Sequence, residues 1–325
     1  MHYAVPYKTK QFYFALIKLS IVVGAFYFIY NKIYKNENLQ FGSFLKYLQE
    51  NEIFSTRTII FLVILSVFNW FFEILKWKYL VKVIQNISFK NASEQSLGAL
   101  TASLITPNRI GDYGAKAIYF PKQLRPKIVL LNLLGNMSQM LITIGFGMVG
   151  LLIFVHRYQI DIDYYKVTRF TLLLLILCVF AVFGIRQTRF KIKGFSLKHI
   201  ISFAKQISLK THAITVTLSL IRYLIFSFQL YYLLTLFGVD IAYTKAMVNI
   251  TSLYFLASIV PTISIFDVVI KGSIAVFLFN YLAINELTIL KIEIVVTSMW
   301  LLNFAIPSVL GSYFVLNFKR PKKEK

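Results

Sequence analysis

Residues 106–114 read TPNRIGDYG, and this polar stretch interrupts an apolar region that runs over residues 95–121. Proline lacks the backbone donor that a helix needs and glycine favours helices poorly, so Pro107, Gly111 and Gly114 break the helix. At 1.5 Å per residue the two helical pieces are roughly 18 and 15 Å long. Neither piece crosses a hydrocarbon core of about 30 Å. The stretch therefore predicts a re-entrant hairpin of two half-helices that enters and leaves the membrane on one side.

A second apolar region, residues 246–285, is broken in a similar way at VPTISIFD, residues 260–267. In both breaks Ala-Ser precedes a proline, which is followed by an aspartate and by a lysine four residues later. Three residues recur at an offset of 154 or 155: Pro107, Asp112 and Lys116 in the first break match Pro261, Asp267 and Lys271 in the second. The offset predicts an internal repeat that includes both hairpins.

The repeat divides the chain into two halves of opposite orientation. Residues 1–157 hold two spans, the inner hairpin 95–121 and one span, and residues 158–318 repeat that order around the outer hairpin 246–285. Residues 319–325 form a basic tail. Inverted repeats with interrupted helices at matching positions indicate the substrate site of a transporter.

The composition of the chain indicates that its remaining apolar segments lie in a membrane. The chain is 58% hydrophobic and 15% charged, against roughly 45–50% and 25% in soluble domains. This excludes a soluble enzyme, a secreted disulfide scaffold and a disordered chain. Six uninterrupted stretches are long enough to span: Phe12–Ile33, Thr58–Leu80, Lys127–Val155, Phe170–Ile185, His212–Phe237 and Leu290–Leu316. The predicted fold class is all-α, a polytopic integral membrane protein with eight apolar regions, namely six full spans and two broken re-entrant hairpins.

The net charge of +22 is distributed unevenly about the predicted membrane. With the amino terminus inside and the six spans alternating, most of the 35 Lys and Arg residues lie inside and most of the 13 acids outside. The positive-inside rule then predicts that both termini are cytoplasmic. Cytoplasmic loops account for the charge, so no nucleic-acid partner is expected. The bias toward Lys, Ile, Asn and Phe favours the cytoplasmic membrane of a bacterium.

Arg109 lies inside the first break, between Asn108 and Gly111, where the ends of the two half-helices should converge. A guanidinium stays charged and binds phosphate oxygens in pairs. A helix that begins nearby also directs free backbone N–H groups toward an anion. We therefore expect Arg109, Asn108 and Gly111 to bind a lipid phosphate that enters from the cytoplasmic side. The alternative is a packing arginine bonded to carbonyl oxygens.

Arg222 lies near the middle of the fifth span, and an intramembrane arginine is a functional candidate by default. We expect it to join the phosphate site, with Asp112 or Asp267 as its partner, although a structural partner remains open. The pairs Asp112/Lys116 and Asp267/Lys271 have the i, i+4 spacing of helical ion pairs, which also suits the helix dipole. A purely structural role for these pairs is the alternative.

Charged residues near span ends have a simpler interpretation. Lys18, Lys76 and Lys78 are expected to extend their ammonium groups toward water. Glu73 is expected to pair with Lys76 along its helix. The basic stretch Arg186–Lys210 is expected to be a solvated cytoplasmic loop near anionic headgroups.

Catalytic signatures are absent from the sequence. It has no Walker A motif, no Gly-rich dinucleotide loop, no HExxH and no GxSxG. The single cysteine, Cys178, excludes an internal disulfide and a thiolate metal cluster. We therefore predict no catalytic residue, no metal site and no cofactor.

The stretch TPNRIGDYGAKA resembles the Pro-x-Arg-x-Gly-Glu/Asp segment of the lysylphosphatidylglycerol synthase transmembrane family, a flippase-like family also known as uncharacterised membrane protein family 0104. Pro107, Arg109, Gly111 and Asp112 stand at the positions of that motif. The resemblance covers nearly the whole chain in the order and length of its spans.

The second break is similar to a later segment of the same family, Pro-x-x-x-Gly-Gly-x-Gly-x-x-Glu, with Pro261 at the proline. Ser264, Ile265 and Phe266 replace its glycines, and Lys271 stands where the family has glutamate. These departures mean that the outer hairpin need not share the substrate chemistry of the family.

The resemblance implies a lipid translocase that moves aminoacylated phosphatidylglycerol or polyprenyl-linked carriers between leaflets. In bifunctional members a soluble synthase domain follows the membrane part. The chain ends at Lys325, so we expect no aminoacyl-transfer enzyme. Two other functions remain open: a small-anion transporter that uses the same site, and a non-transporting membrane partner of a glycosyltransferase or lipid synthase.

Overall fold

The structure is a computed structural model of the whole chain. It describes residues 55–104, 106, 109–160, 197–239, 241–260, 264–282 and 286–318, with isolated positions among residues 19–27 and 165–172. Every regular element in these ranges is a helix. Two predicted spans, Phe12–Ile33 and Phe170–Ile185, lie outside the described residues except for the isolated positions, and so does the tail 319–325.

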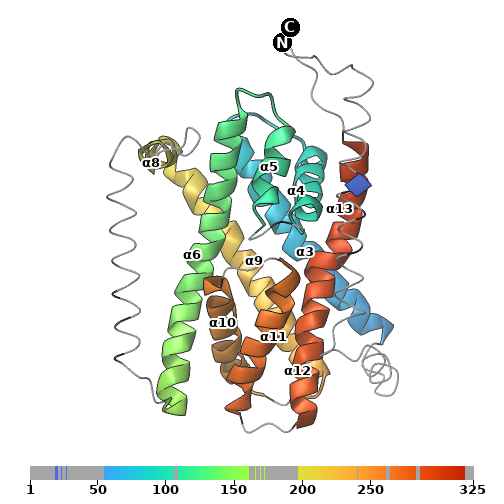
Figure 1. Cartoon of the computed structure of the whole chain (residues 1–325), viewed down its shortest axis with the longest axis vertical. Coiled ribbons are helices and arrows are strands. Elements are labelled where there is room, and N and C mark those ends of the chain that lie inside the picture. The colour runs from blue at the N-terminus through green and yellow to red at the C-terminus, as the bar shows by residue number, and fades with distance from the viewer. Residues whose placement is uncertain are drawn as a thin grey trace, which may run out of the picture.

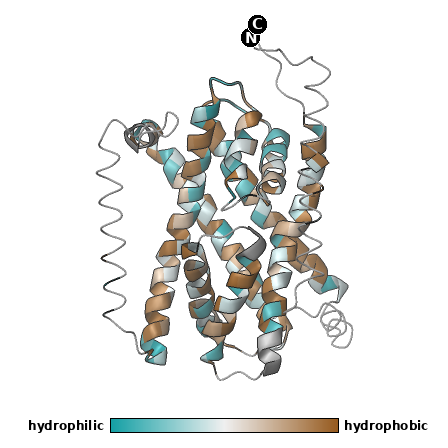
Figure 2. Ribbon diagram, in the orientation of Figure 1, coloured by the Kyte–Doolittle hydropathy of each residue, from teal (hydrophilic) through white to brown (hydrophobic). Residues whose placement is uncertain are grey.

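Four helices are long and apolar enough to cross a membrane: α3 (Thr56–Val81), α6 (Arg125–Tyr158), α9 (Leu209–Leu236) and the segment Lys291–Asn317. The last comprises most of α12 (Glu286–Trp300), a π-helical turn η1 (Leu301–Ala305) and α13 (Ile306–Asn317). All four agree with predicted spans to within three residues at each end. The chain is therefore an all-helical, multi-pass membrane protein, and Figure 2 shows hydrophobic residues along these long helices.

The two interrupted regions form helical hairpins. In the first, α4 (Phe89–Ser103) packs against α5 (Gly111–Ile118), and in the second, α10 (Tyr243–Ile259) packs against α11 (Ser264–Asn280). These helices have 15, 8, 17 and 17 residues, which is shorter than the roughly 20 residues of a full crossing. Figure 1 shows that α4–α5 and α10–α11 extend from opposite ends of the molecule toward its middle.

The first hairpin begins six residues before the predicted start at residue 95. Ser88 caps α4 by accepting a hydrogen bond from the Asn91 N–H at 3.1 Å, so α4 begins at Phe89. The first turns of α4 are polar, and hydropathy alone therefore did not include them. Likewise α10 begins at Tyr243, ahead of the predicted residue 246.

Small residues allow the long helices to approach the hairpins closely. A Cβ atom on Gly311 of α13 would overlap the backbone of Leu97 and the Thr101 hydroxyl of α4. The same hydroxyl donates a hydrogen bond of 2.7 Å to the Ser308 carbonyl of α13. On the other side of the molecule, a Cβ on Gly150 of α6 would overlap Thr251 of α10. Such small-residue contacts are the usual way in which helices associate in lipid.

The basic stretch after the fourth predicted span is more ordered than the expected solvated loop. It contains α8 (Leu197–Gln206), and the side chains of Phe203 and Ile207 are buried in a hydrophobic cluster with Trp77 of α3. Apolar residues interspersed among the lysines hold this segment against the bundle. The prediction of a solvated loop is therefore wrong for Phe203 and Ile207, while Ile201, Ser202, Lys205 and Gln206 are exposed.

Candidate functional site

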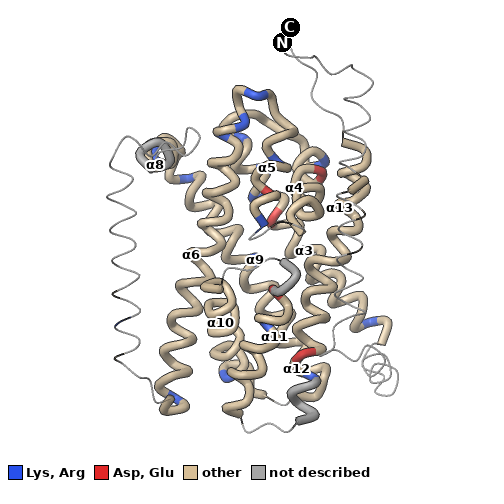
Figure 3. Tube along the Cα trace, viewed as in Figure 1, with Lys and Arg blue, Asp and Glu red and all other residues tan. Residues whose placement is uncertain are grey.

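A polar cavity of about 250 Å³ lies among α3, α4, α5, α6 and α9. Ten residues line it: Trp70, Glu73, Ser96, Leu100, Arg109, Asp112, Tyr113, Lys116, Asn136 and Arg222. Five of the ten carry a charge, and Figure 3 shows charged positions on α3 and α5 within the helical part of the molecule. Charged side chains at membrane depth are expensive and usually functional.

Arg109 enters this cavity from the turn of the first hairpin. Its backbone has φ 57°, a left-handed conformation that a non-glycine residue adopts only when the surroundings enforce it. The Thr106 hydroxyl enforces it here, because it accepts from the Gly111 N–H and donates to the Ser103 carbonyl, both at 2.9 Å. A Cβ on Gly111 would lie 2.7 Å from the Ala102 carbonyl oxygen, so only glycine fits.

The Arg109 guanidinium lacks a carboxylate partner among the described residues. Its Nε atom is buried and makes no hydrogen bond there. Its one aromatic contact is with Phe304 of η1, whose ring centroid lies 4.9 Å from the guanidinium carbon. Arg109 is therefore a half-buried cation whose side chain makes no bond to a carbonyl or carboxylate oxygen among the described residues. This favours the binding interpretation of Arg109 over that of a packing arginine.

The N-terminus of α5 does not offer the free N–H groups that the sequence suggested. The Gly111 N–H is bonded to Thr106, and the N–H groups of Asp112 and Tyr113 donate to the carbonyls of Arg109 and Ile110 at 3.0 and 3.2 Å. The tight turn itself satisfies these donors. The structure thus gives Gly111 a role in shaping the turn. Two further predicted residues of this turn, Pro107 and Asn108, lie outside the described residues.

Arg222 of α9 pairs with a different acid from the two that were expected. Its Nη1 donates to Glu73 Oε2 and its Nε donates to Asn69 Oδ1, each at 2.8 Å. Arg222 forms no ion pair with Asp112 or Asp267, which pair instead with Lys116 and Lys271 on their own helices. The Nη2 group makes no hydrogen bond with a described residue.

Glu73 and Lys76 of α3 form the expected pair, but inside the protein. Lys76 Nζ lies 2.8 Å from the same Glu73 Oε2 that binds Arg222, and the two residues are 2% and 8% exposed. The prediction that Lys76 reaches water at a span end is therefore wrong. The missed signal was the spacing of Ser66, Asn69, Glu73 and Lys76, which places four polar residues on one helical face.

The pair on α5 belongs to a wider network with α6. Lys116 Nζ lies 3.3 Å from Asp112 and donates to Asn132 Oδ1 at 2.8 Å, while Asn132 donates to Asp112 Oδ2 at 2.6 Å. The ammonium group also lies 4.7 Å from the ring centre of Trp77. Nearby, Asn136 donates to the Tyr113 hydroxyl at 3.0 Å. These contacts fix α5 against α6.

A second polar network ties α3 and α9 to the π-helical turn. Asn303 of η1 accepts from Asn69 at 2.6 Å and donates to Gln229 at 2.9 Å. Its backbone carbonyl accepts from the Trp70 indole at 2.9 Å, and Gln229 also donates to Ser66 at 2.8 Å. π-Helical turns are rare and are frequently found at functional sites. The sequence had no local signal for this turn.

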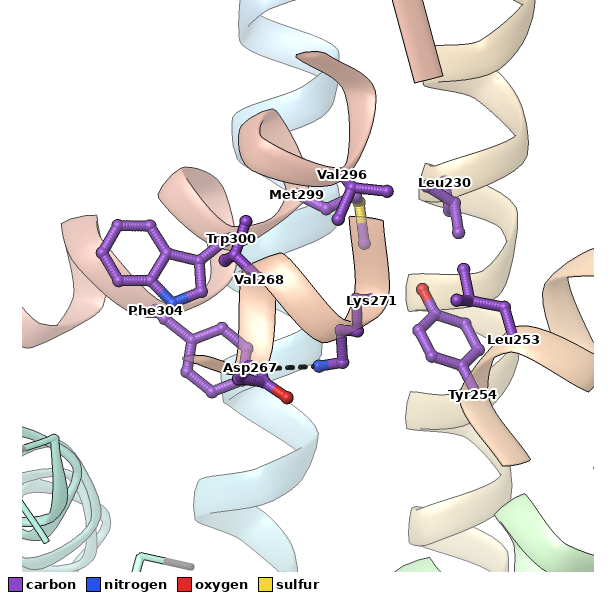
Figure 4. A pocket seen from close by; sticks show the side chains of 10 residues that line it. All are labelled: Leu230, Leu253, Tyr254, Asp267, Val268, Lys271, Val296, Met299, Trp300 and Phe304. Carbon is purple, nitrogen blue, oxygen red and sulfur yellow. Dashed lines mark hydrogen bonds and ion pairs between the residues drawn. The ribbon is translucent and has the colours of Figure 1, made fainter. Parts of the chain in front are cut away.

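A smaller cavity of about 40 Å³ lies on the side of the second hairpin. Figure 4 shows the Asp267–Lys271 ion pair of α11 facing Phe304, Trp300 and Tyr254 in this cavity. Lys271 Nζ lies 2.8 Å from Asp267 Oδ2 and 5.6 Å from the centre of the Phe304 ring. The predicted Pro261 of this hairpin lies outside the described residues.

Phe304 connects the two cavities. Its ring lines the smaller one and contacts Arg109, which lines the larger one. Lys271 contacts the same ring from the second hairpin. One aromatic side chain thus lies between the two hairpins, with a cation from each against it.

The comparisons with known proteins agree with the motif in the first hairpin. The family model described as the lysylphosphatidylglycerol synthase TM region matches residues 15–266, which include the whole first hairpin and end one residue before Asp267. This confirms the resemblance that TPNRIGDYGAKA suggested. No curated protein and no solved structure matches the chain.

Proposed function

The chain belongs to the lysylphosphatidylglycerol synthase TM region family, and from that premise we propose that it is a lipid translocase of flippase or scramblase type. It moves a phosphate-bearing lipid, either a phospholipid or a polyprenyl-linked lipid, between the leaflets of a bacterial cytoplasmic membrane. The chain performs no aminoacyl transfer itself. The observation that carries the proposal is Arg109 in the larger cavity, which has no carboxylate partner among the described residues.

Arg109 supports the proposal because its present surroundings do not compensate its charge. An arginine at membrane depth costs roughly 2.5–3.5 kcal/mol on insertion scales. A phosphate would recover that cost, since two parallel N–H···O bonds form between a guanidinium and phosphate oxygens. The free Nη2 of Arg222 lines the same cavity and supplies a second donor.

Helix packing supports the inverted repeat, which we include in the proposal. At an offset of about 155 residues, α4–α5 corresponds to α10–α11, and α6 corresponds to α12–α13. The contact of α6 with α10 is then equivalent, under this repeat, to the contact of α13 with α4. The contact of α3 with α9 joins corresponding helices of the two halves. Two such halves can open the site to one side of the membrane at a time.

The proposed path follows the charges. A headgroup phosphate enters the larger cavity, which the charge distribution assigns to the cytoplasmic side, and binds Arg109 and Arg222. It then passes Phe304 and reaches Lys271 at the second hairpin, while the acyl chains remain in lipid. Both termini lie in the cytoplasm in this arrangement.

The test is transbilayer movement in liposomes that contain the purified protein. Fluorescent phosphatidylglycerol and phosphatidylcholine are placed in both leaflets, and loss of fluorescence to a membrane-impermeant reductant reports exchange. We expect the wild type to move the anionic lipid, Arg109→Ala to slow this by at least about tenfold, which is 1.4 kcal/mol of binding, and Arg157→Ala to have no effect. Arg157 is the matched control because it is exposed at the end of α6.

The same liposomes separate the other two functions. If the wild type moves neither lipid but takes up a water-soluble anion, the site belongs to a small-anion transporter. If it moves nothing and co-purifies with a glycosyltransferase or lipid synthase, it is the membrane partner of that enzyme. Either result would overturn the translocase proposal for these lipids, as would full activity of Arg109→Ala.

A further inference from the structure

We propose that the larger cavity selects a terminal phosphate with two negative charges, a phosphomonoester, over the single charge of a phosphodiester. This inference rests on the proposed function, because it names the headgroup class that the phosphate site takes. Two observations carry it: the balance of charges around the cavity, and the number of guanidinium donors that remain free.

The charges around the cavity do not cancel. Its described lining contains the cations Arg109, Lys116 and Arg222 and the acids Glu73 and Asp112. Lys76 lies behind this lining, in contact with Glu73. Four cations therefore face two carboxylates. Including the outer Asp267–Lys271 pair leaves the excess unchanged, because that pair is neutral.

The contacts show where the two excess charges reside. Asp112 is paired with Lys116. Glu73 Oε2 alone holds both Lys76 and Arg222, each at 2.8 Å, so one carboxylate is divided between two cations. Arg109 has no carboxylate among the described residues. The Nε of Arg109 is buried without a hydrogen bond to a described residue.

An excess of two positive charges around this cavity favours an occupant with two negative charges. Buried charges interact strongly because water screens them poorly, so an occupant that carries one charge leaves one cation uncompensated. A phosphodiester carries one charge at neutral pH. A phosphomonoester carries close to two above its second pKa of about 6.

The free donors favour the same ligand. Arg109 offers its whole guanidinium, and Arg222 offers its Nη2 after bonding Asn69 and Glu73. A phosphodiester has two unesterified oxygens, whereas a phosphomonoester has three. Three oxygens allow a paired contact with Arg109 and a further contact with Arg222 at the same time.

The experiment compares two short-chain lipids that differ in this charge. Binding of dioctanoyl phosphatidic acid and of dioctanoyl phosphatidylglycerol is measured by calorimetry with the full chain in phosphatidylcholine nanodiscs, at pH 8.0 and pH 5.5. We expect phosphatidic acid to bind at least about tenfold tighter at pH 8.0, which corresponds to 1.4 kcal/mol. The preference should shrink severalfold at pH 5.5, where the monoester is mostly monoanionic.

The variant Lys76→Met tests the charge balance without changing a residue that lines the cavity. It removes one excess positive charge and keeps the length of the side chain, so the preference for phosphatidic acid should fall severalfold while phosphatidylglycerol still binds. Arg109→Lys is the second variant. It keeps the positive charge but loses the paired N–H donors of the guanidinium, so we expect it to weaken the binding of both lipids. Thermal unfolding of each variant in detergent identifies any that fails to fold.

The outcomes separate this inference from the function on which it rests. Equal binding of the two lipids, or tighter binding of phosphatidylglycerol, would overturn the charge selection and leave the translocase proposal standing. If neither lipid binds, both fall. Inorganic phosphate is the third probe: if it displaces phosphatidic acid at equal concentration, the dianion site stands but its ligand is a soluble phosphate, and the lipid function falls.

Discussion

Replacing Glu73 by glutamine should destabilise the fold by about 3 kcal/mol. Glu73 Oε2 holds Lys76 and Arg222 at 2.8 Å each, and Glu73 and Lys76 are buried. Removing one member of a buried ion pair typically costs 3–5 kcal/mol, because the other member is left without compensation. The glutamine carbonyl still accepts one hydrogen bond, so we expect the lower end of this range.

Unfolding in detergent, followed by circular dichroism, measures the effect of Glu73→Gln. A loss of 3 kcal/mol corresponds to a decrease of roughly 6–12 °C in the midpoint, at about 2–4 °C per kcal/mol. Glu94→Gln is the matched control on α4, because the Glu94 side chain makes no hydrogen bond or ion pair with a described residue. We expect the control to change stability by less than about 0.5 kcal/mol.

A second substitution tests the cause of the loss. Adding Lys76→Met to Glu73→Gln removes one of the two cations that the acid compensated, so the double variant should be about 1–3 kcal/mol more stable than Glu73→Gln alone. A cost below 1 kcal/mol for Glu73→Gln would refute the idea that one buried carboxylate serves two cations. Failure of Lys76→Met to restore stability would refute the charge explanation in particular.

Four other changes test the turn, the helix packing, the barrier and the orientation. Thr106→Val should cost about 1–2 kcal/mol and slow lipid movement, because it leaves a backbone N–H of the hairpin turn without its acceptor. Gly311→Val should cost about 3 kcal/mol in thermal unfolding, because a Cβ there overlaps α4. Phe304→Ala should accelerate lipid exchange in liposomes severalfold by opening the contact between the cavities, and an unchanged rate would exclude Phe304 as a barrier. In a Cys178→Ser background, Lys122→Cys should react with an impermeant maleimide only from the cytoplasmic side, and labelling from outside would invert the predicted topology.

The parts of the fold that sequence predicts well depend on local physics. The ends of α3, α6 and α9 follow from apolar runs that must match the thickness of a membrane. The two hairpin turns follow from proline and glycine, which act within one turn of a helix. The Asp267–Lys271 pair follows from i, i+4 spacing on α11. Each of these features is set by residues within a few positions of one another.

The site itself depends on contacts between distant segments, which no local pattern reports. Arg222 and Glu73 are 149 residues apart, and Asn69 and Asn303 are 234 apart. The sequence correctly predicts that Arg222 lies in a span. It suggests Asp112 or Asp267 as the partner of Arg222, because these aspartates lie in the two interrupted hairpins, whereas the observed partner is Glu73. The polar face of α3 was the usable signal. A glutamate at a helix end and one at the core of a bundle look alike until the neighbouring helices are known.

In the proposed mechanism, the Phe304 ring is held by a cation from each hairpin and must move for the phosphate to pass. A cation against an aromatic ring gains roughly 0.5–2 kcal/mol, more when water is excluded. The ring that contacts both Arg109 and Lys271 is therefore held in place by about 1–4 kcal/mol in total. In the proposed path, this interaction is strong enough to keep Phe304 between the two cavities and weak enough to break at ambient temperature. In the proposed mechanism, a phosphate that binds Arg109 neutralises the guanidinium charge, weakens the contact between Arg109 and Phe304 and so lowers the barrier to its own passage.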